Sequence, residues 1–256
     1  MWREALTPPA AGPAPASGGG PVAAAQALPG VMMLLLMQWR TAWVPWGLSR
    51  LALRSFAIGR APGMRFARVL GSGRDGGFGL VPSVHRQGLV AFFDDLDQAQ
   101  AFAYGNAGVQ RCRERAQESW LGLMRATSAR GSWAGVGLAP SLVPVSGAPV
   151  AALTRASIRP GSAARFWSHS PPAQAGLAQA RGCRVAVGLG EAPVLRQATF
   201  SLWDDQAAMD AYARSGAHAQ AIRGAWREGW FAESMFARLV LVASDGQWHG
   251  RRVDAG

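Results

Sequence analysis

Apolar stretches of strand length alternate with helical patterns along this chain. The most apolar stretch, VMMLLLMQW from Val31 to Trp39, has about nine residues and suits a buried strand, because a membrane-spanning helix needs about 20. In the second half, helical patterns lie at 160–169 and after Asp205. Strand-length stretches there lie at 149–158, 183–192, 194–203 and 234–244. We therefore predict the order β-α-β-β-α-β for the second half.

The first half repeats this pattern. Phe93-Asp94-Asp95 corresponds to Trp203-Asp204-Asp205 at a separation of 110 residues (204 − 94 = 110). The same separation relates Gln110, Arg113, Glu118 and Trp120 to Gln220, Arg223, Glu228 and Trp230. Each copy opens with an apolar strand near an arginine, Arg40 or Arg155, and closes with Gly131-Ser132-Trp133 or Gly246-Gln247-Trp248. Identity at so many aligned positions indicates an internal duplication.

The duplication predicts an α+β fold. Two tandem ferredoxin-like repeats, residues 30–147 and 148–250, would pack sheet against sheet as an intrachain dimeric α+β barrel. Residues 1–29 are rich in Ala, Pro and Gly, which predicts a disordered tail, and residues 251–256 are expected to be a flexible C-terminus. The tail lacks the order of basic, apolar and cleavage regions that a signal peptide has.

Each copy also contains a Gly-x-Gly stretch. Gly71-Ser72-Gly73 and Gly188-Leu189-Gly190 align at a separation of 117, so the first copy has the longer hairpin loop. A dinucleotide site needs G-x-G-x-x-G at the start of a helix, whereas strand-like sequence follows both stretches. We therefore predict that these glycines supply positive φ angles for turns, or bulges, at a strand-to-strand junction.

The amino-acid composition indicates which classes of binding partner and which cellular compartment to expect. The formal net charge is +11, and all 26 basic residues are arginine. The arginines are scattered and no nucleic-acid-binding motif is present, which argues against nucleic acid and favours an acidic protein partner or an anionic membrane surface. Cys112 and Cys183 are isolated, as expected of two buried thiols in a reducing compartment. We expect a cytoplasmic protein without a transmembrane helix, in possible peripheral contact with a membrane.

Candidate chemistry comes from a difference between the copies. His218 replaces Gly108 on an otherwise similar helical stretch, while Arg223 corresponds to Arg113. A histidine on an apolar stripe is either a partly buried residue bonded to the backbone or a metal ligand, and the pattern alone leaves both open. The aspartate pairs precede helices, which favours helix capping over acid–base catalysis. Eleven tryptophans suit core packing and also a pocket for a long apolar ligand.

Three phrases of the second half resemble a known family. They are ALTRASIRPGSAARFW, VGLGEAPVLRQATFSLW and HAQAIRGAWREGWFAESMFARLVL. Over about residues 148–250 they are similar to the spheroidene monooxygenases, also called acyclic carotenoid 2-ketolases. Residues 31–147 match the family more loosely, and the N-terminal tail does not match.

The resemblance implies a haem-dependent monooxygenase that introduces a keto group at the end of an acyclic carotenoid in carotenoid biosynthesis. It implies non-covalent haem b (iron), O2, electrons from a ferredoxin, and the surroundings of a photosynthetic membrane. His218 would be the axial iron ligand, and Arg223 would face a haem propionate or be solvated. Two alternatives remain open on the same barrel, namely a non-catalytic binding protein for haem or another apolar ligand, and an oxygenase without a cofactor.

Overall fold

Both halves of the chain have the predicted order of strands and helices. The computed structural model describes residues 28–53, 59–74, 81–141, 147–168, 176–177, 179–192, 194–214 and 228–254. The first half contains β2 (Val31–Trp39), η1 (Thr41–Trp43), α2 (Val44–Leu53), β3 (Met64–Gly73), β4 (Pro82–Phe93), α3 (Leu96–Gly105), α4 (Ala107–Arg115) and β5 (Ala116–Gly131). The second contains β7 (Val150–Ile158), η3 (Pro160–Ser162), a helical turn at 163–168, β8 (Cys183–Ala192), β9 (Arg196–Trp203), α6 (Gln206–Ala213) and β10 (Phe231–Trp248).

The main strands close into a ring. They are hydrogen-bonded in the order β10-β5-β2-β4-β3-β8-β9-β7, and a further pairing of β10 with β7 completes the ring. Within it, β5-β2-β4-β3 of the first half and β10-β7-β9-β8 of the second half have the same strand order. The predicted α+β class and the barrel formed within one chain are therefore confirmed.

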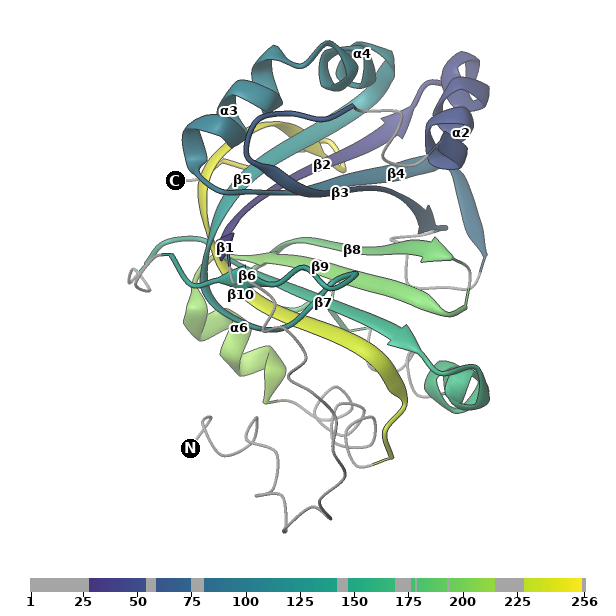
Figure 1. The fold of residues 1–256 in the computed structure, drawn as a ribbon, viewed down its shortest axis with the longest axis vertical. Helices are drawn as coiled ribbons and strands as arrows, with labels where there is room; N and C mark the ends of the chain where they lie inside the picture. Colours follow the sequence, from purple (N-terminus) through teal and green to yellow (C-terminus); the bar gives the residue numbers. More distant parts are fainter. Residues whose placement is uncertain are drawn as a thin grey trace, which may run out of the picture.

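Apolar side chains fill the ring because successive residues of each strand point to opposite faces of the sheet. Met32, Leu34 and Leu36 of β2 lie inside the barrel in a buried cluster with Trp120 and Phe200. A second cluster lies outside the first half, between its sheet and its helices. Figure 1 shows α2, α3 and α4 on the outside of the first half and α6 on the opposite outside, over the second. In the described residues, no helix is long and apolar enough to cross a membrane.

The second aspartate of each Asp-Asp pair caps a helix, as predicted. The Asp95 carboxylate accepts a hydrogen bond from the backbone N–H of Gln98 at 2.8 Å, at the start of α3. Asp205 accepts one from Ala208 at 2.8 Å, at the start of α6. These bonds satisfy N–H groups that have no partner within the helix, so each pair fixes where its helix begins.

The first aspartate of each pair holds the neighbouring strand. Asp94 forms an ion pair with Arg65 of β3, and Asp204 forms one with Arg184 of β8. Both halves therefore use the same contact between the end of one strand and the start of its neighbour, as expected of a duplicated unit.

The two Gly-x-Gly stretches pair with each other. Gly71 lies opposite Gly190, and Ser72 opposite Leu189, and these two positions make up the whole β3–β8 pairing, which we call the seam. None of these glycines has a positive φ, so the predicted turn conformation is wrong: the stretches lie inside β3 and β8. The predicted bulges are confirmed, because the ladders shift register beside Gly71 and beside Gly190.

Strand pairing also corrects the alignment of the two copies. Gly71 lies opposite Gln87 in the first half, as Gly190 lies opposite Gln197 in the second, which gives a separation of 119 residues (190 − 71 = 119) rather than 117. The ends of β2 and β7 are separated by the same number, so Leu36, and not Arg40, is the counterpart of Arg155.

Two segments that were predicted to be irregular contain short strands. β1 (Leu28–Pro29), at the end of the predicted tail, pairs in parallel with β6 (Leu138–Ala139). β11 (Arg251–Arg252), in the predicted flexible C-terminus, pairs with β10, and the Val253 carbonyl accepts a hydrogen bond from the indole of Trp120 at 2.9 Å. Backbone hydrogen bonds to adjacent strands, which composition does not reveal, extend the ordered chain at both ends. The rest of the predicted tail, residues 1–27, lies outside the described residues.

Candidate functional site

A pocket of about 590 Å³ lies at the seam. Part of its wall is the backbone of Gly71, Gly73 and Gly190, which leave room because they carry no side chains. The apolar lining comprises Leu48, Leu51 and Ala52 of α2 together with Val69, Pro82, Leu189 and Val194. The volume lies in the range of ligand-binding pockets in proteins.

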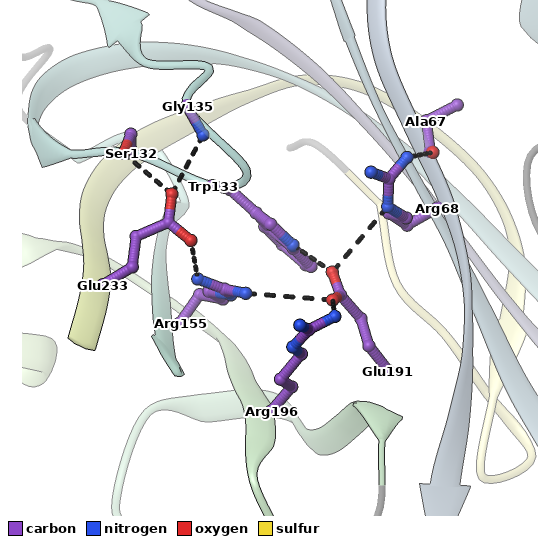
Figure 2. Close-up of polar contacts among 9 residues, drawn as sticks. All are labelled: Ala67, Arg68, Ser132, Trp133, Gly135, Arg155, Glu191, Arg196 and Glu233. Atoms are coloured by element: carbon purple, nitrogen blue, oxygen red, sulfur yellow. Dashed lines mark hydrogen bonds and ion pairs between the residues drawn. The ribbon is translucent and has the colours of Figure 1, made fainter. Parts of the chain in front are cut away.

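Charged residues from five strands line this pocket, and Figure 2 shows them close to one another. They are Arg68 of β3, Arg155 of β7, Glu191 of β8, Arg196 of β9 and Glu233 of β10. Arg155 forms an ion pair with Glu233, and its Nη2 lies 3.8 Å from a Glu191 oxygen. The other two arginines approach Glu191 at 4.0 Å (Arg68) and 3.9 Å (Arg196). We call these five residues the charged cluster.

Arg155 is the most deeply buried member of the charged cluster. Its side chain is 4% exposed, and its guanidinium lies 5.7 Å from the ring centroid of Trp133. The indole N–H of Trp133 donates a hydrogen bond to Glu191. The Nε of Arg155 is buried and has no hydrogen-bond partner among the described residues. A buried guanidinium with an unused donor is costly, so this group is a candidate for binding a ligand.

Glu233 is held by three donors. Its carboxylate accepts hydrogen bonds from the Ser132 hydroxyl and the Gly135 N–H, both at 2.9 Å, and from Arg155. Burial alone would raise the pKa of Glu233, but the hydrogen bonds from Gly135 and Ser132 and the charge of Arg155 lower it below 4.5. The folded protein therefore favours the carboxylate form.

We expect part of the acid sensitivity of the protein to come from Glu233. Because its pKa is lowered on folding, Glu233 stabilises the fold above pH 4.5, and this contribution is lost as the pH falls through the folded pKa. Urea titrations between pH 6 and pH 3 should show a smaller loss of stability in Glu233→Gln than in the wild type. Glu114→Gln, at an exposed position of α4, should retain the wild-type pH dependence. An unchanged profile in Glu233→Gln would contradict this assignment.

The outer face of the second half carries smaller side chains than that of the first. In the first half Met37, Val69 and Leu89 are buried, and with Gly108 of α4 they border a cavity of only about 20 Å³. Their counterparts by strand pairing are Ala156, Gly188 and Thr199. A face that is closely filled in the first half is therefore lined by short side chains in the second.

The predicted ligands His218 and Arg223 lie outside the described residues. In the described part of the chain, no three His, Cys, Asp or Glu side chains gather as a metal site.

Sequence relatives decide the family. Over 223 residues the chain is 52% identical to spheroidene monooxygenase from Rubrivivax gelatinosus, covering 87% of this chain and 86% of that protein. The chain belongs to the spheroidene monooxygenase family. Spheroidene monooxygenase from Rhodobacter capsulatus is 35% identical over 215 residues, covering 82% of this chain and 89% of that protein. No protein-family model matches the chain.

Membership of the spheroidene monooxygenase family makes the protein an O2-dependent enzyme and sets aside a purely non-catalytic role. Among solved structures, an aldoxime dehydratase has a TM-score of 0.57 at 10% identity, covering 84% of this chain and 82% of that one. A second aldoxime dehydratase, in complex with butyraldoxime, has a TM-score of 0.56 at 9% identity, covering 84% and 80%. At this level of identity the likeness shows the fold alone.

Sequence reasoning missed the charged cluster in this spheroidene monooxygenase family member. Glu191 and Glu233 stand in phrases that carried the family resemblance, yet neither was a candidate site residue. Arg155 could have been found from its counterpart Leu36, had the copies been aligned at the correct separation. Of the tryptophans, Trp120 and Trp203 are core residues and Trp133 joins the core to the charged cluster.

The two cysteines are not activated. Both are half-buried free thiols, and burial raises the pKa of Cys112 and of Cys183 to about 11. Since the thiolate is the reactive form of cysteine, these side chains are protonated at neutral pH and are not nucleophiles.

Proposed function

We propose that this protein is a haem-dependent monooxygenase that introduces a keto group into an acyclic carotenoid of the spheroidene type. The observation that carries this proposal is the 52% identity to spheroidene monooxygenase from Rubrivivax gelatinosus over most of both chains. The pocket at the seam, with apolar walls and a few charged groups, suits part of a long apolar substrate.

The stoichiometry of the reaction determines which co-substrates and how many electrons the enzyme needs. Inserting one oxygen atom into a C–H bond of a methylene gives an alcohol and consumes one O2, two electrons and two protons, with one water released. A second insertion at the same carbon gives a geminal diol, which loses water to form the ketone. The enzyme therefore needs an electron donor, and its net charge of +11 suits docking of an acidic ferredoxin.

Short side chains on the outer face of the second half support the proposal of a flat apolar cofactor there. Ala156, Gly188 and Thr199 carry short side chains, or none, on this face, where longer side chains fill the first half. His218 would be the axial ligand at this face, and Arg223 would pair with a propionate. Haem held in this way, without a covalent link, would supply iron that binds and activates O2.

An absorption spectrum of the haem-supplemented protein tests the proposal. We expect a Soret band in the wild type and its loss in His218→Ala, because the imidazole would be the axial ligand. Ala156→Met, which introduces the side chain of its counterpart Met37, should also weaken haem binding because it fills the same face. Both variants should lose ketone formation from spheroidene by about 100-fold or more.

His249→Ala, in an exposed turn, is the matched control and should retain the haem spectrum. A colourless wild-type protein that still forms the ketone would favour the cofactor-independent alternative. A haem protein that binds spheroidene without oxidising it would contradict the proposed reaction.

One surface suits peripheral contact with a membrane. Trp43 of η1 and Leu48 and Leu53 of α2 are exposed, and the guanidinium of Arg115 stacks 4.3 Å from the ring centroid of Trp43. Exposed apolar side chains next to arginines are typical of surfaces that bind anionic lipid. Because Leu48 also lines the pocket, this surface would bring the pocket close to the membrane in which the carotenoid dissolves.

A further inference from the structure

The charged cluster has more hydrogen-bond donors than acceptors. Both carboxylates accept hydrogen bonds from the protein, Glu191 from Trp133, and Glu233 from backbone and side-chain donors. The Nε of Arg155, by contrast, has no partner. Arg196 has only its ion pair at 3.9 Å among the interactions of the described residues. A ligand that presents an acceptor would therefore satisfy donors that the described residues leave unused.

The remaining walls of the pocket are apolar and favour an apolar ligand. Leu48 and Val194 line the pocket and are 39% and 38% exposed, so apolar surface continues from inside the pocket to its rim. A small inorganic anion would leave this surface in contact with water, whereas an apolar chain would cover it. A volume of about 590 Å³ holds the end of a long polyene but not its whole length. The lining thus fits a chain that is apolar along its length and carries an oxygen at its end.

The backbone around the pocket is strained. Ala134 and Val194 both line it, and both have positive φ angles, +53° and +70°. This conformation is unfavourable for residues with side chains, especially β-branched ones. Such strain gathers at binding sites, where surrounding contacts hold the chain in place, and it is a second observation that marks this pocket as a site.

We propose that the pocket at the seam binds the oxygen-bearing end group of the carotenoid, an inference that rests on the proposed carotenoid activity. The ether, hydroxyl or keto oxygen of the end group accepts hydrogen bonds from Arg155 and Arg196, and the apolar walls cover the adjoining chain. The pocket therefore selects carotenoids that carry an oxygen at one end and fixes which end enters.

Binding without turnover tests this subsite. Quenching of tryptophan fluorescence, measured in detergent without reductant, gives the affinity for an acyclic carotenoid with a terminal methoxy group and for an acyclic hydrocarbon carotenoid. We expect the wild type to bind the methoxy carotenoid about 10-fold more tightly, as a hydrogen bond to a charged donor provides. Arg196→Met should abolish this preference with little change for the hydrocarbon. Arg65→Met, which removes an exposed arginine outside the pocket, should retain it.

A second variant changes the size of the pocket without touching a charge. The Cβ of a residue at Gly71 would lie 3.6 Å from Leu51, an ordinary contact, so Gly71→Val should fold and partly fill the pocket. It should weaken the binding of both carotenoids by about 10-fold or more.

Several results would overturn the inference. The wild type could bind the two carotenoids with equal affinity, or Arg196→Met could weaken the binding of both equally. Gly71→Val could leave the binding of both carotenoids unchanged, or Arg196→Met could lose haem. The last result would assign the arginines to the cofactor. If the preference is found and neither carotenoid yields a ketone, the proposed reaction is wrong and the subsite stands.

Discussion

Replacing Gly131 or Gly246 with alanine is expected to lower the free energy of unfolding by about 3–4 kcal/mol. The two glycines begin the matching Gly-Ser-Trp and Gly-Gln-Trp stretches that close the two copies, and have φ angles of +75° and +101°. A Cβ at Gly131 would overlap the carbonyl oxygen of Ser234, and one at Gly246 the carbonyl oxygen of Ser119. Because these oxygens belong to the paired strands β10 and β5, they cannot move without disturbing the ladder that joins the two halves.

Gly147→Ala is the control for this prediction. Gly147 has a φ of +76°, and an added Cβ would meet none of the described residues within 4 Å. Its substitution should therefore cost only about 1 kcal/mol, the strain of the backbone conformation alone. Urea denaturation followed by circular dichroism measures all three variants. Equal losses at Gly131 and Gly147 would mean that the overlap with the β10 backbone has no effect.

Arg155→Leu is expected to destabilise the protein by about 3 kcal/mol. Leucine suits the site sterically, because the counterpart position in the first half is the buried Leu36. The loss is electrostatic: without the guanidinium, Glu191 and Glu233 are two like charges close together with their main counterion removed. Denaturation in urea at pH 7 measures this effect.

Two further variants isolate the charge effect. Arg155→Leu combined with Glu233→Gln should recover part of the loss, since the second substitution removes the carboxylate that has lost its ion pair with Arg155. Arg165→Leu breaks an ion pair whose side chains are 65% and 31% exposed, and should cost less than about 1 kcal/mol. If the double variant is less stable than Arg155→Leu, charge repulsion is not the cause.

Local signals in the sequence were enough for much of the fold. The strand at 31–39 follows from a continuous apolar stretch that is too short to span a membrane. The caps at Asp95 and Asp205 depend on hydrogen bonds that reach only three residues along the chain, so their neighbours predict them. The order of elements, read twice from a duplicated sequence, was sufficient for the α+β class.

The charged cluster could not be predicted in this way. Arg155, Glu191 and Glu233 are far apart in the sequence, and they meet only because the ring brings β7, β8 and β10 together. The conformation of the Gly-x-Gly stretches was predicted wrongly for a related reason. Glycine occurs both in turns and where another strand approaches closely, and the sequence does not distinguish these two uses. His218, whose role rests on the family resemblance, stays a prediction.

The two strand pairings that join the halves of the ring differ in length, and this difference has a mechanical consequence. The two halves are joined along β5 and β10 from Met235 to Gly246, whereas on the other side the described strands pair only at the two positions of the seam. Separating β3 from β8 breaks far fewer hydrogen bonds than separating β5 from β10, so local opening at the seam requires the least free energy. We therefore expect the barrel to open first at the seam, with β5 and β10 as the hinge, which would widen the entrance for a stiff, rod-shaped molecule while the fold stays intact.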